Sequence, residues 1–431
     1  MNMLFNEREA RRRIEALPRG VEPRIRWAGV DLPGEVGAGN LLCVGAVGTG
    51  KTRMHRELMR SVAPNITADS DCRVVIYDVR GDLLSELHGM VPSAEVLIFN
   101  PFDKRSVAWD VAADVQTADE ARAFADSLFP SDNRGTGGFF LYAARAVVSG
   151  LIDSLNRTHP GTWDLRQLIL VTRAPQRLER VLAGSNLVEQ YASEANTFAN
   201  VRNMITCAMH GLEPIAAAWE HADQKVSLKQ WAASGRSILV LGGRREMQPS
   251  VEVVNGSALR IITRALVAGP ESPDRARLWF FCDDLPAAGR LEFLPAMVNA
   301  RAKGVRCVLG FHDLEGLAGV YGNRETAMEI AARCATISWL KLASAETAEW
   351  ASRRTGDVIS PADFLNLPQD GGGAVRGVHL IKGLGGVFES TTRYEFPKTN
   401  PADDFQPRPD SRLRLRPWSA DDDKWLNDGR P

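Results

Sequence analysis

The segment Gly45-Ala46-Val47-Gly48-Thr49-Gly50-Lys51-Thr52 has the residue types and spacing of a phosphate-binding loop. Its glycines let consecutive backbone amides turn toward phosphate oxygens, and the helix expected after the loop directs its positive end to the same place. Lys51 is expected to reach the β- and γ-phosphates, and the Thr52 hydroxyl to ligate Mg²⁺. The sequence therefore predicts a nucleotide site formed by Gly45, Gly48, Thr49, Gly50, Lys51 and Thr52.

Two acidic residues that could act on the bound nucleotide follow the apolar run Leu278–Cys282. A phosphate-binding loop needs a carboxylate on a neighbouring strand to hold the metal, and Asp283 stands where such a strand would end. We expect Asp283 to hold Mg²⁺ through water and Asp284 to be the base that polarises the attacking water. The alternative is that Asp-Asp-Leu-Pro is a turn that caps the next helix.

His312 closes a further apolar run, which begins at Arg306. In such folds a polar side chain on the adjacent strand senses the γ-phosphate, and His312 has the position for this role. A capping histidine or a core histidine would fit the same pattern, so these interpretations stay open.

The chain alternates short apolar runs with helical patterns. This alternation predicts an α/β fold with a mainly parallel central sheet that is covered on both faces. Residues 112–231 show helical spacing only and are expected to form an inserted all-α domain. The sheet domain would then comprise residues 26–111 and 232–397. We expect residues 1–25 to form a charged helix with a turn, and residues 398–431 to form a flexible tail rich in Pro, Asp and Arg.

Composition excludes some classes of protein. The chain has 431 residues, of which 44% are apolar and 24% are charged, enough for about two or three globular domains. A formal net charge of −1 predicts neither nucleic acid nor membrane as a partner, so any nucleic-acid surface must be local or assembled from several subunits. No apolar run approaches the roughly 20 residues that cross a bilayer, and the charged N-terminus is unlike a signal peptide.

Three longer motifs carry a resemblance to one family. VVIYDVRGDLL, NPFDKRSVAWDV and TAEWASRRTGD, found in this order, resemble motifs of the TraD/TrwB-like coupling proteins of conjugative type IV secretion, which are related to FtsK and HerA. The similarity runs from about Arg26 to Asp357. It implies a RecA-like nucleotide domain that uses ATP and Mg²⁺, and a homo-hexameric ring that passes single- or double-stranded DNA through a central channel.

The resemblance also implies partners and a location. Such a motor would link the relaxase–DNA complex to the type IV secretion ATPase or channel subunits, in the bacterial cytoplasm and at the inner face of the membrane. The family usually carries transmembrane helices before the nucleotide domain, and this sequence shows none. We expect a truncated chain, a soluble version of the motor, or a separate protein that supplies the membrane anchor.

Two departures from the family fall in the residues of hydrolysis. The family usually has Glu where this chain has Asp284, and tends to have Gln where it has His312. Asp is one methylene shorter than Glu, and a misplacement of about 1 Å can cost on the order of a hundredfold in rate. Three hypotheses follow: a DNA-translocating motor, an ATP-binding adaptor with little hydrolysis that docks partners, or a related ring pump of another mobile element or a defence system.

A ring motor needs cations that face its DNA channel and one cation that reaches a neighbour's nucleotide. We expect binding largely without sequence specificity, although solvated surface charge is an equal alternative for each channel candidate. The channel candidates are Arg244, Arg245, Arg301, Lys303 and Arg306.

Arg333, or else Arg324, is the candidate for a catalytic arginine that acts on the neighbouring subunit. Aromatic residues could stack on DNA bases, but their helical spacing favours a place in the core. These residues are Phe139, Phe140 and Tyr142.

Overall fold

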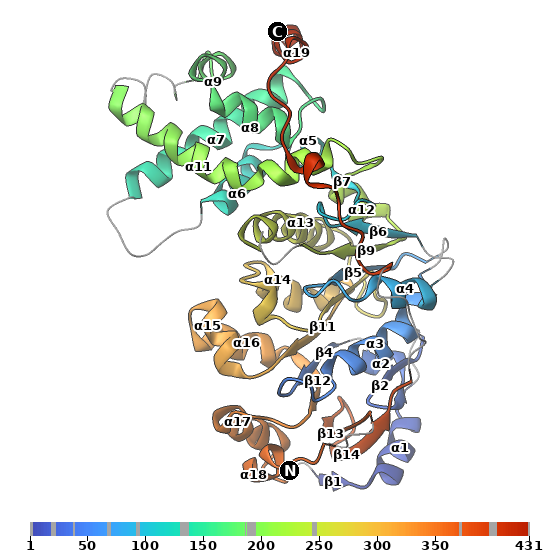
Figure 1. Cartoon of the computed structure of the whole chain (residues 1–431). Helices are drawn as coiled ribbons and strands as arrows, with labels where there is room; N and C mark the ends of the chain where they lie inside the picture. Colours follow the sequence, from blue (N-terminus) through green and yellow to red (C-terminus); the bar gives the residue numbers. More distant parts are fainter. Residues whose placement is uncertain are drawn as a thin grey trace. The chain divides into compact units, whose positions relative to one another are not determined.

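Two compact units make up the chain (Figure 1). The first, which we call the sheet unit, comprises Met1–Leu97, Ala232–Gly242 and Thr263–Phe405. The second, which we call the helical unit, comprises Ile98–Trp231, Gly243–Ile262 and Gln406–Pro431. The structure is a computed structural model, and it describes residues 3–18, 23–37, 39–66, 70–91, 95–129, 138–185, 187, 195–243, 248–369, 373–395 and 403–429.

A ten-stranded sheet, counted over the described residues, has the strand order β1-β14-β13-β12-β4-β11-β10-β5-β9-β6. The strands from β12 to β9 in this order are parallel to their neighbours, whereas β13 is antiparallel to β12 and to β14. The strands are β1 (Met3–Phe5), β4 (Asn40–Val44), β5 (Arg73–Tyr77), β6 (Val96–Phe99), β9 (Ile238–Leu241), β10 (Leu278–Cys282), β11 (Val305–Phe311), β12 (Cys334–Trp339), β13 (Ala374–Leu380) and β14 (Gly386–Arg393).

The central strands are buried along their whole length. Every residue of β4, β5, β10 and β11 is buried, as expected for parallel strands that are covered on both faces. The mainly parallel sheet predicted from the sequence is therefore present. The helices of this unit are α1 (Glu7–Glu15), α2 (Gly34–Gly37), α3 (Lys51–Val62), α4 (Leu84–Met90), α14 (Leu294–Asn299), α15 (Leu314–Tyr321), α16 (Arg324–Ala332), α17 (Ala345–Thr355) and α18 (Pro361–Leu365).

Strand register brings the chemically interesting residues to one edge of the sheet. Val44 at the end of β4 pairs with Phe311 at the end of β11, and Cys282 at the end of β10 pairs with Leu309 of β11. Because parallel strands end on the same side, the residues that follow these three strands meet at the carboxyl edge.

The N-terminal residues contribute a strand as well as the expected helix. β1 pairs in parallel with β14 at the edge of the sheet, and α1 follows it with Asn6 as its N-cap. Sequence reasoning missed β1 because a strand of three residues gives almost no periodic signal.

Helices dominate the helical unit, but it also contains two short strands that the sequence did not indicate. β7 (Ala108–Trp109) pairs in parallel with β8 (Lys225–Val226). The helices are α5 (Val111–Asp114), α6 (Ala118–Leu128), α7 (Gly138–Thr158), α8 (Leu165–Arg173), α9 (Pro175–Val181), α11 (Ala195–Trp219), α12 (Leu228–Ser234), α13 (Gln248–Ala268) and α19 (Ala420–Asp428), of which α12 and α13 extend beyond this unit.

Asp114 joins the two ends of the helical insertion. Its buried carboxylate accepts hydrogen bonds from the Ser227 hydroxyl at 2.7 Å and from the backbone amides of Leu228 and Lys229 at 2.7 and 3.0 Å. The Trp109 indole donates to the same carboxylate at 2.7 Å. One side chain thus closes a segment of more than a hundred residues, because a buried carboxylate needs several donors to offset its desolvation.

The expected flexible tail is wrong for residues 403–429. Its final helix is α19 (Figure 1). Asp422 of this helix accepts hydrogen bonds from Arg166 of α8 at 2.6 and 2.8 Å. Arg408 is also buried, and its guanidinium donates to the Pro101 and Asp103 carbonyls at 3.1 Å each. Charged composition suggested a solvated segment, but partners far away in the sequence bury these charges.

Within the part of the chain that the structure describes, α7 is long and apolar enough to cross a membrane by length and composition alone. Eight of its residues, Ala143, Ala144, Val147, Val148, Leu151, Ile152, Ser154 and Leu155, are buried in the helical unit. A core helix passes the same test of length and composition, so this feature is weak support for a membrane span.

Candidate nucleotide site

The phosphate-binding segment lies between β4 and α3, at the carboxyl edge of the sheet. Gly48 and Gly50 have φ angles of 78° and 110°, which residues with a Cβ rarely adopt. A Cβ at Gly50 would also lie 2.3 Å from Val375 Cγ2, whereas a Cβ at Gly48 would meet nothing within 4 Å. Gly50 is the N-cap of α3 and gives it no side-chain hydrogen bond, so the first amides of α3 are available to an anion.

Lys51 is buried and folds back over the loop that precedes it. Its Nζ donates to the carbonyls of Gly45 and Ala46 at 2.6 and 3.1 Å, and it lies 2.7 Å from His312 Nδ1. Burial lowers the pKa of the Lys51 ammonium, while the carboxylates of Asp284 and Asp283 oppose that shift. Loop carbonyls therefore take the place of water as hydrogen-bond acceptors for the Lys51 ammonium. Phosphate oxygens could in turn take the place of these carbonyls.

Thr52 and Asp283 meet although 231 positions separate them in the chain. The Thr52 hydroxyl donates to Asp283 Oδ2 at 2.8 Å, and the Asp283 side chain is 19% exposed. A hydroxyl and a carboxylate oxygen at the N-terminus of α3 are oxygen ligands of the kind that Mg²⁺ prefers, with phosphates and water supplying the rest. These residues therefore fit a nucleotide that binds together with Mg²⁺.

Asp284 and His312 lie beside this pair. His312 Nε2 is 3.5 Å from Asp284 Oδ2, and Asp284 and His312 are about one quarter and one third exposed. His312 Nδ1 also lies 3.3 Å from the Gly45 carbonyl oxygen, and Nε2 faces the Asp284 carboxylate. The two residues predicted to act in hydrolysis are thus in contact with each other and, through His312, with Lys51.

Two buried titratable groups lie behind the metal-binding pair. A small cavity of about 20 Å³ is lined by Thr52, His55, Asp78 and Asp283 among others. Burial raises the pKa of Asp78 to about 6 and lowers the pKa of His55 to about 4. Both groups therefore favour their neutral forms more than they would in water, and the sequence analysis identified neither of them.

Arg80 is a further residue of the site that sequence reasoning missed. It follows β5, and its guanidinium donates to Thr52 Oγ1 at 3.2 Å. The sequence did hold a signal, because VVIYDVRGDLL was recognised as a motif. What the pattern lacked was the strand order, which puts the end of β5 directly beside the end of β10.

Arg333, the first candidate for an arginine that acts on a neighbouring subunit, lies apart from the site. Arg333 precedes β12 and so lies at the amino edge of the sheet, opposite the edge that carries Lys51. Its side chain is 54% exposed, with Glu329 at 3.9 Å. Arg324 is paired with Glu346 in the first turn of α17. Within one chain, Arg333 is thus not positioned to contact the nucleotide expected at Lys51.

The channel candidates differ from one another. Arg306 is completely buried in β11, and its guanidinium donates to three backbone carbonyls at 2.8 to 3.1 Å. The expectation that it faces DNA is wrong, because carbonyls at the amino edge of the sheet satisfy the charge internally. Arg301 is exposed and Lys303 half-buried. Arg244 and Arg245 lie outside the described residues.

The aromatic residues at the start of α7 are not in the core. Phe139 and Tyr142 are 59% and 68% exposed, and Phe140 is half-buried against the Phe139 ring. The helical spacing that favoured burial is present, but it places this turn of α7 at the surface. The expected place in the core is thus wrong for Phe139 and Tyr142, and base stacking stays the untested alternative.

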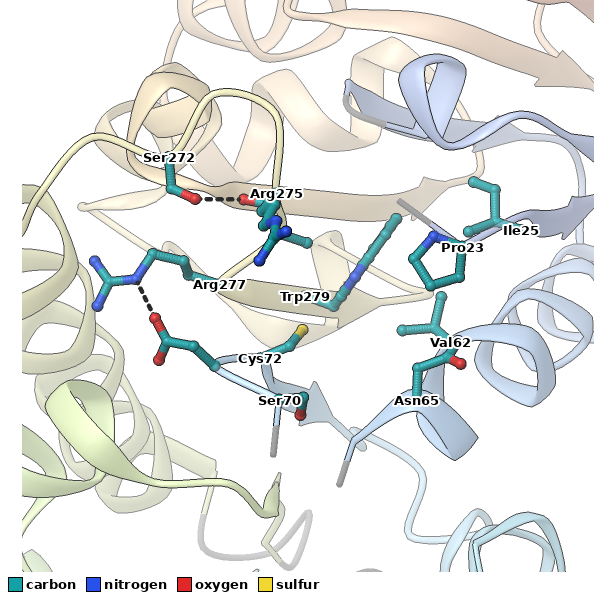
Figure 2. Close-up of a pocket in the computed structure, with 12 residues that line it drawn as sticks. Pro23, Ile25, Val62, Asn65, Ser70, Cys72, Ser272, Arg275, Arg277 and Trp279 are labelled. Carbon is teal, nitrogen blue, oxygen red and sulfur yellow. Dashed lines mark hydrogen bonds and ion pairs between the residues drawn. The ribbon is translucent and has the colours of Figure 1, made fainter. Parts of the chain in front are cut away.

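A separate cavity of about 330 Å³ lies at the amino edge of the sheet, where β5 and β10 begin (Figure 2). Trp279 and Val62 form apolar walls, and Arg277 is held there by Asp71, whose Oδ2 lies 3.2 Å from Nε. None of the site residues predicted from the sequence lines this cavity.

Comparison with known proteins agrees with this geometry. A family model described as "Type IV secretion-system coupling protein DNA-binding domain" matches residues 24–359. The coupling protein TraD of Escherichia coli (strain K12) is 25% identical over 299 residues, which are 67% of this chain and 40% of TraD. The chain therefore spans about two fifths of the length of that relative.

Solved structures of TrwB are similar over nearly the whole chain. TrwBdeltaN70, a bacterial conjugative coupling protein in its unbound monoclinic form, matches with a TM-score of 0.75 and 20% identity, covering 95% of this chain and 96% of that one. The plasmid coupling protein TrwB in complex with ADP and Mg²⁺ matches with a TM-score of 0.74 and 21% identity, covering 94% and 97%. This likeness confirms the predicted α/β, RecA-like fold.

Proposed function

This chain belongs to the family of type IV secretion-system coupling protein DNA-binding domains, and on that premise we propose that it is an ATP-dependent motor that translocates DNA. The observation that supports this most directly is the meeting of Thr52 with Asp283, and of Asp284 with His312 and Lys51, at one edge of the sheet. Such an edge can bind and act on a triphosphate.

The residues of the site would divide the work. The amides of the loop and of the first turn of α3 would bind the phosphates, and Lys51 would exchange its carbonyl partners for β- and γ-phosphate oxygens. Thr52 and Asp283 would hold Mg²⁺, which neutralises phosphate charge when it is bound. Asp284 would orient and polarise the attacking water, and His312 would hold Asp284 and report the γ-phosphate to Lys51.

The proposal extends to the assembly. We expect homo-hexameric rings, DNA of either strandedness bound largely without sequence preference, and partners at the relaxase and at the secretion channel. A position in the bacterial cytoplasm at the inner face of the membrane would suit these partners. Arg333, which lies at the amino edge of its own sheet, would act on the nucleotide of a neighbouring copy.

ATP turnover with and without DNA tests the proposal. The assay is run over a protein concentration series that permits rings, with single-stranded and duplex DNA at low salt. We expect DNA to stimulate turnover and Lys51→Ala to abolish it, because this variant removes the ammonium that stabilises the developing phosphate charge. A wild-type protein that binds no DNA at low salt would count strongly against a motor.

A second function, an ATP-binding adaptor with little hydrolysis, is favoured by one specific feature. Asp284 is shorter than the Glu usual in the family, and its carboxylate is already paired with His312 at 3.5 Å. Such an adaptor would bind ATP through the same loop and dock a relaxase or a secretion subunit.

A further inference from the structure

A cation of the chain lies on the oxygens that are expected to hold Mg²⁺. Nη2 of Arg80 is 3.2 Å from Thr52 Oγ1 and 3.7 Å from Asp283 Oδ2. The single proton of the Thr52 hydroxyl is donated to Asp283, so only the hydroxyl lone pairs can bind a metal. Arg80 uses one of these lone pairs, and it therefore competes with Mg²⁺ for the same two oxygens.

Several hydrogen bonds fix the loop that carries Arg80. Asp78, at the end of β5, accepts hydrogen bonds from the amides of Gly81 at 2.9 Å and Leu83 at 3.2 Å. From α3, Arg56 donates to Asp82 Oδ1 at 2.9 Å and to the Asp82 carbonyl at 3.2 Å. The turn between β5 and α4 is thus fixed both to the sheet and to the phosphate-binding helix. Its geometry places Arg80 beside Thr52, Asp283 and Asp82.

Asp82 offers the Arg80 guanidinium an alternative partner outside the expected Mg²⁺ site. Asp82 Oδ2 lies 3.2 Å from the same nitrogen of Arg80, and the Arg80 side chain is 42% exposed. When a dication binds at Asp283, repulsion between like charges disfavours a guanidinium 3.7 Å from the same carboxylate. Asp82 can retain the arginine after Thr52 and Asp283 release it, and a planar guanidinium matches two phosphate oxygens well.

We propose that Arg80 is a built-in counter-ion of the Thr52 and Asp283 oxygens. Mg²⁺ displaces this arginine, and the arginine then binds the phosphates of the incoming nucleotide. This inference rests on the proposed nucleotide binding at Lys51 and Thr52. It has two opposite consequences. Arg80 lowers the apparent affinity for Mg²⁺, and it supports nucleotide binding when Mg²⁺ is absent.

Binding of a fluorescent, non-hydrolysable ATP analogue tests this without any turnover. Its anisotropy is followed in EDTA and over a series of Mg²⁺ concentrations, with the full chain. For Arg80→Ala we expect affinity in EDTA to fall about tenfold, because a charge-assisted contact to phosphate is lost. We expect the Mg²⁺ concentration for half-maximal binding to fall severalfold, because the competing cation is gone.

Two further variants make the result specific. Arg80→Lys keeps the charge without the planar fork, so its Mg²⁺ dependence should stay close to that of the wild type while affinity in EDTA falls less than in Arg80→Ala. Arg12→Ala removes an exposed arginine of α1 that pairs with Glu9 at 2.9 Å, and should change neither quantity. Circular dichroism melts establish that each variant is folded.

The outcomes separate the inference from the function on which it rests. Equal weakening of Arg80→Ala at every Mg²⁺ concentration would mean that Arg80 only supports the loop, and it would overturn the inference. No change in either quantity would overturn it as well. If the wild type binds no nucleotide at any Mg²⁺ concentration, the proposed function fails first.

Discussion

Asp284, His312 and Lys51 form a connected line of side chains at the carboxyl edge of the sheet. Asp284 contacts His312 through Nε2 at 3.5 Å, and His312 contacts Lys51 through Nδ1 at 2.7 Å. In this arrangement the carboxylate that should polarise water is coupled to the lysine that should bind phosphate. Lengthening the side chain at position 284 by one methylene would therefore shift its carboxylate relative to both His312 and the nucleotide expected at Lys51.

Asp284→Glu should raise ATP turnover by about tenfold, because the longer side chain brings the carboxylate nearer to the attacking water. Turnover is measured with saturating ATP, Mg²⁺ and DNA. Asp284→Asn is the matched control, since it keeps the length of the wild-type side chain but cannot act as a base, and it should be inactive. A rise far above tenfold, from almost no turnover in the wild type, would favour the adaptor hypothesis for the wild type. Equal or lower turnover in this variant would contradict our account of the shorter carboxylate.

At the scale of elements, His379 links three strands of the sheet. It lies on β13, and its ring nitrogens are 2.7 Å from Ser338 Oγ on β12 and 3.0 Å from Ser390 Oγ on β14. Burial lowers the pKa of His379 to about 3, against a usual value of 6.5. The unfolded chain therefore binds a proton between these two values that the folded chain does not bind.

Acidification should for this reason weaken the fold through His379. Stability from neutral His379 is present above the unfolded pKa of 6.5 and is lost as the pH falls toward the folded value. Between about pH 7 and pH 5 the wild type should lose about 2 kcal/mol more than His379→Gln, which keeps two polar atoms but does not titrate. Urea unfolding at several pH values measures this. Parallel losses in both proteins over this range would contradict the prediction.

The C-terminal helix depends on an ion pair that the linear sequence does not reveal. Arg166 is held between Asp422 at 2.6 Å and Glu220 at 3.0 Å, and all three side chains are at least nine-tenths buried. The Arg166 guanidinium lowers the pKa of Asp422, so the carboxylate stays ionised and paired well into the acidic range.

Asp422→Asn should destabilise the chain by about 1–3 kcal/mol, because the buried Arg166 guanidinium loses one of its two charged partners. Asp421→Asn is the matched control on the same helix. Asp421 is 89% exposed and pairs with Lys424 at 3.2 Å, and exposed pairs contribute little. Denaturant unfolding of both variants provides the comparison. A similar stability for Asp422→Asn and Asp421→Asn would show that α19 does not depend on this pair.

At the scale of the whole molecule, the position of Arg333 predicts that ATP turnover differs between a ring and a monomer. Arg333 lies at the amino edge of the sheet and Lys51 at the carboxyl edge, so one chain does not bring them to one nucleotide. Arg333→Ala should then lose most turnover and keep nucleotide affinity, because an arginine that acts between subunits stabilises the transition state rather than the bound substrate.

Mixing two inactive variants tests this directly. Lys51→Ala and Arg333→Ala subunits damage different halves of an interface, so mixed assemblies contain some intact interfaces and should recover part of the turnover. The Arg324→Ala variant, mixed in the same way, is the control for the alternative candidate. Absence of recovery at every mixing ratio, while the mixture still forms rings, would remove Arg333 from this role.

Much of the fold was predictable because local patterns report burial. Apolar runs at β4, β10 and β11 identified the central strands, and the glycine spacing around Lys51 identified the loop, since left-handed glycines and a helix N-terminus are local requirements. The site depends only on where these strands end, so it does not depend on the bounds of the domains.

Long-range partners were not predictable in the same way. The roles of Arg80 and Asp78 depend on the order β10-β5, and the burial of Arg306, Arg166 and Asp422 depends on partners that other segments supply. The sequence around a charged residue does not indicate whether the fold will place a carbonyl or a carboxylate beside it.

The sequence by itself determined that a glycine loop between a strand and a helix would present amides, Lys51 and Thr52 at one point, because the loop and both side chains lie within eight consecutive residues. Only the tertiary structure decided that Asp283, Asp284, His312 and Arg80 converge on that point. Strand order and register are set by the burial of whole apolar faces, which is a property of all the strands together rather than of any one segment.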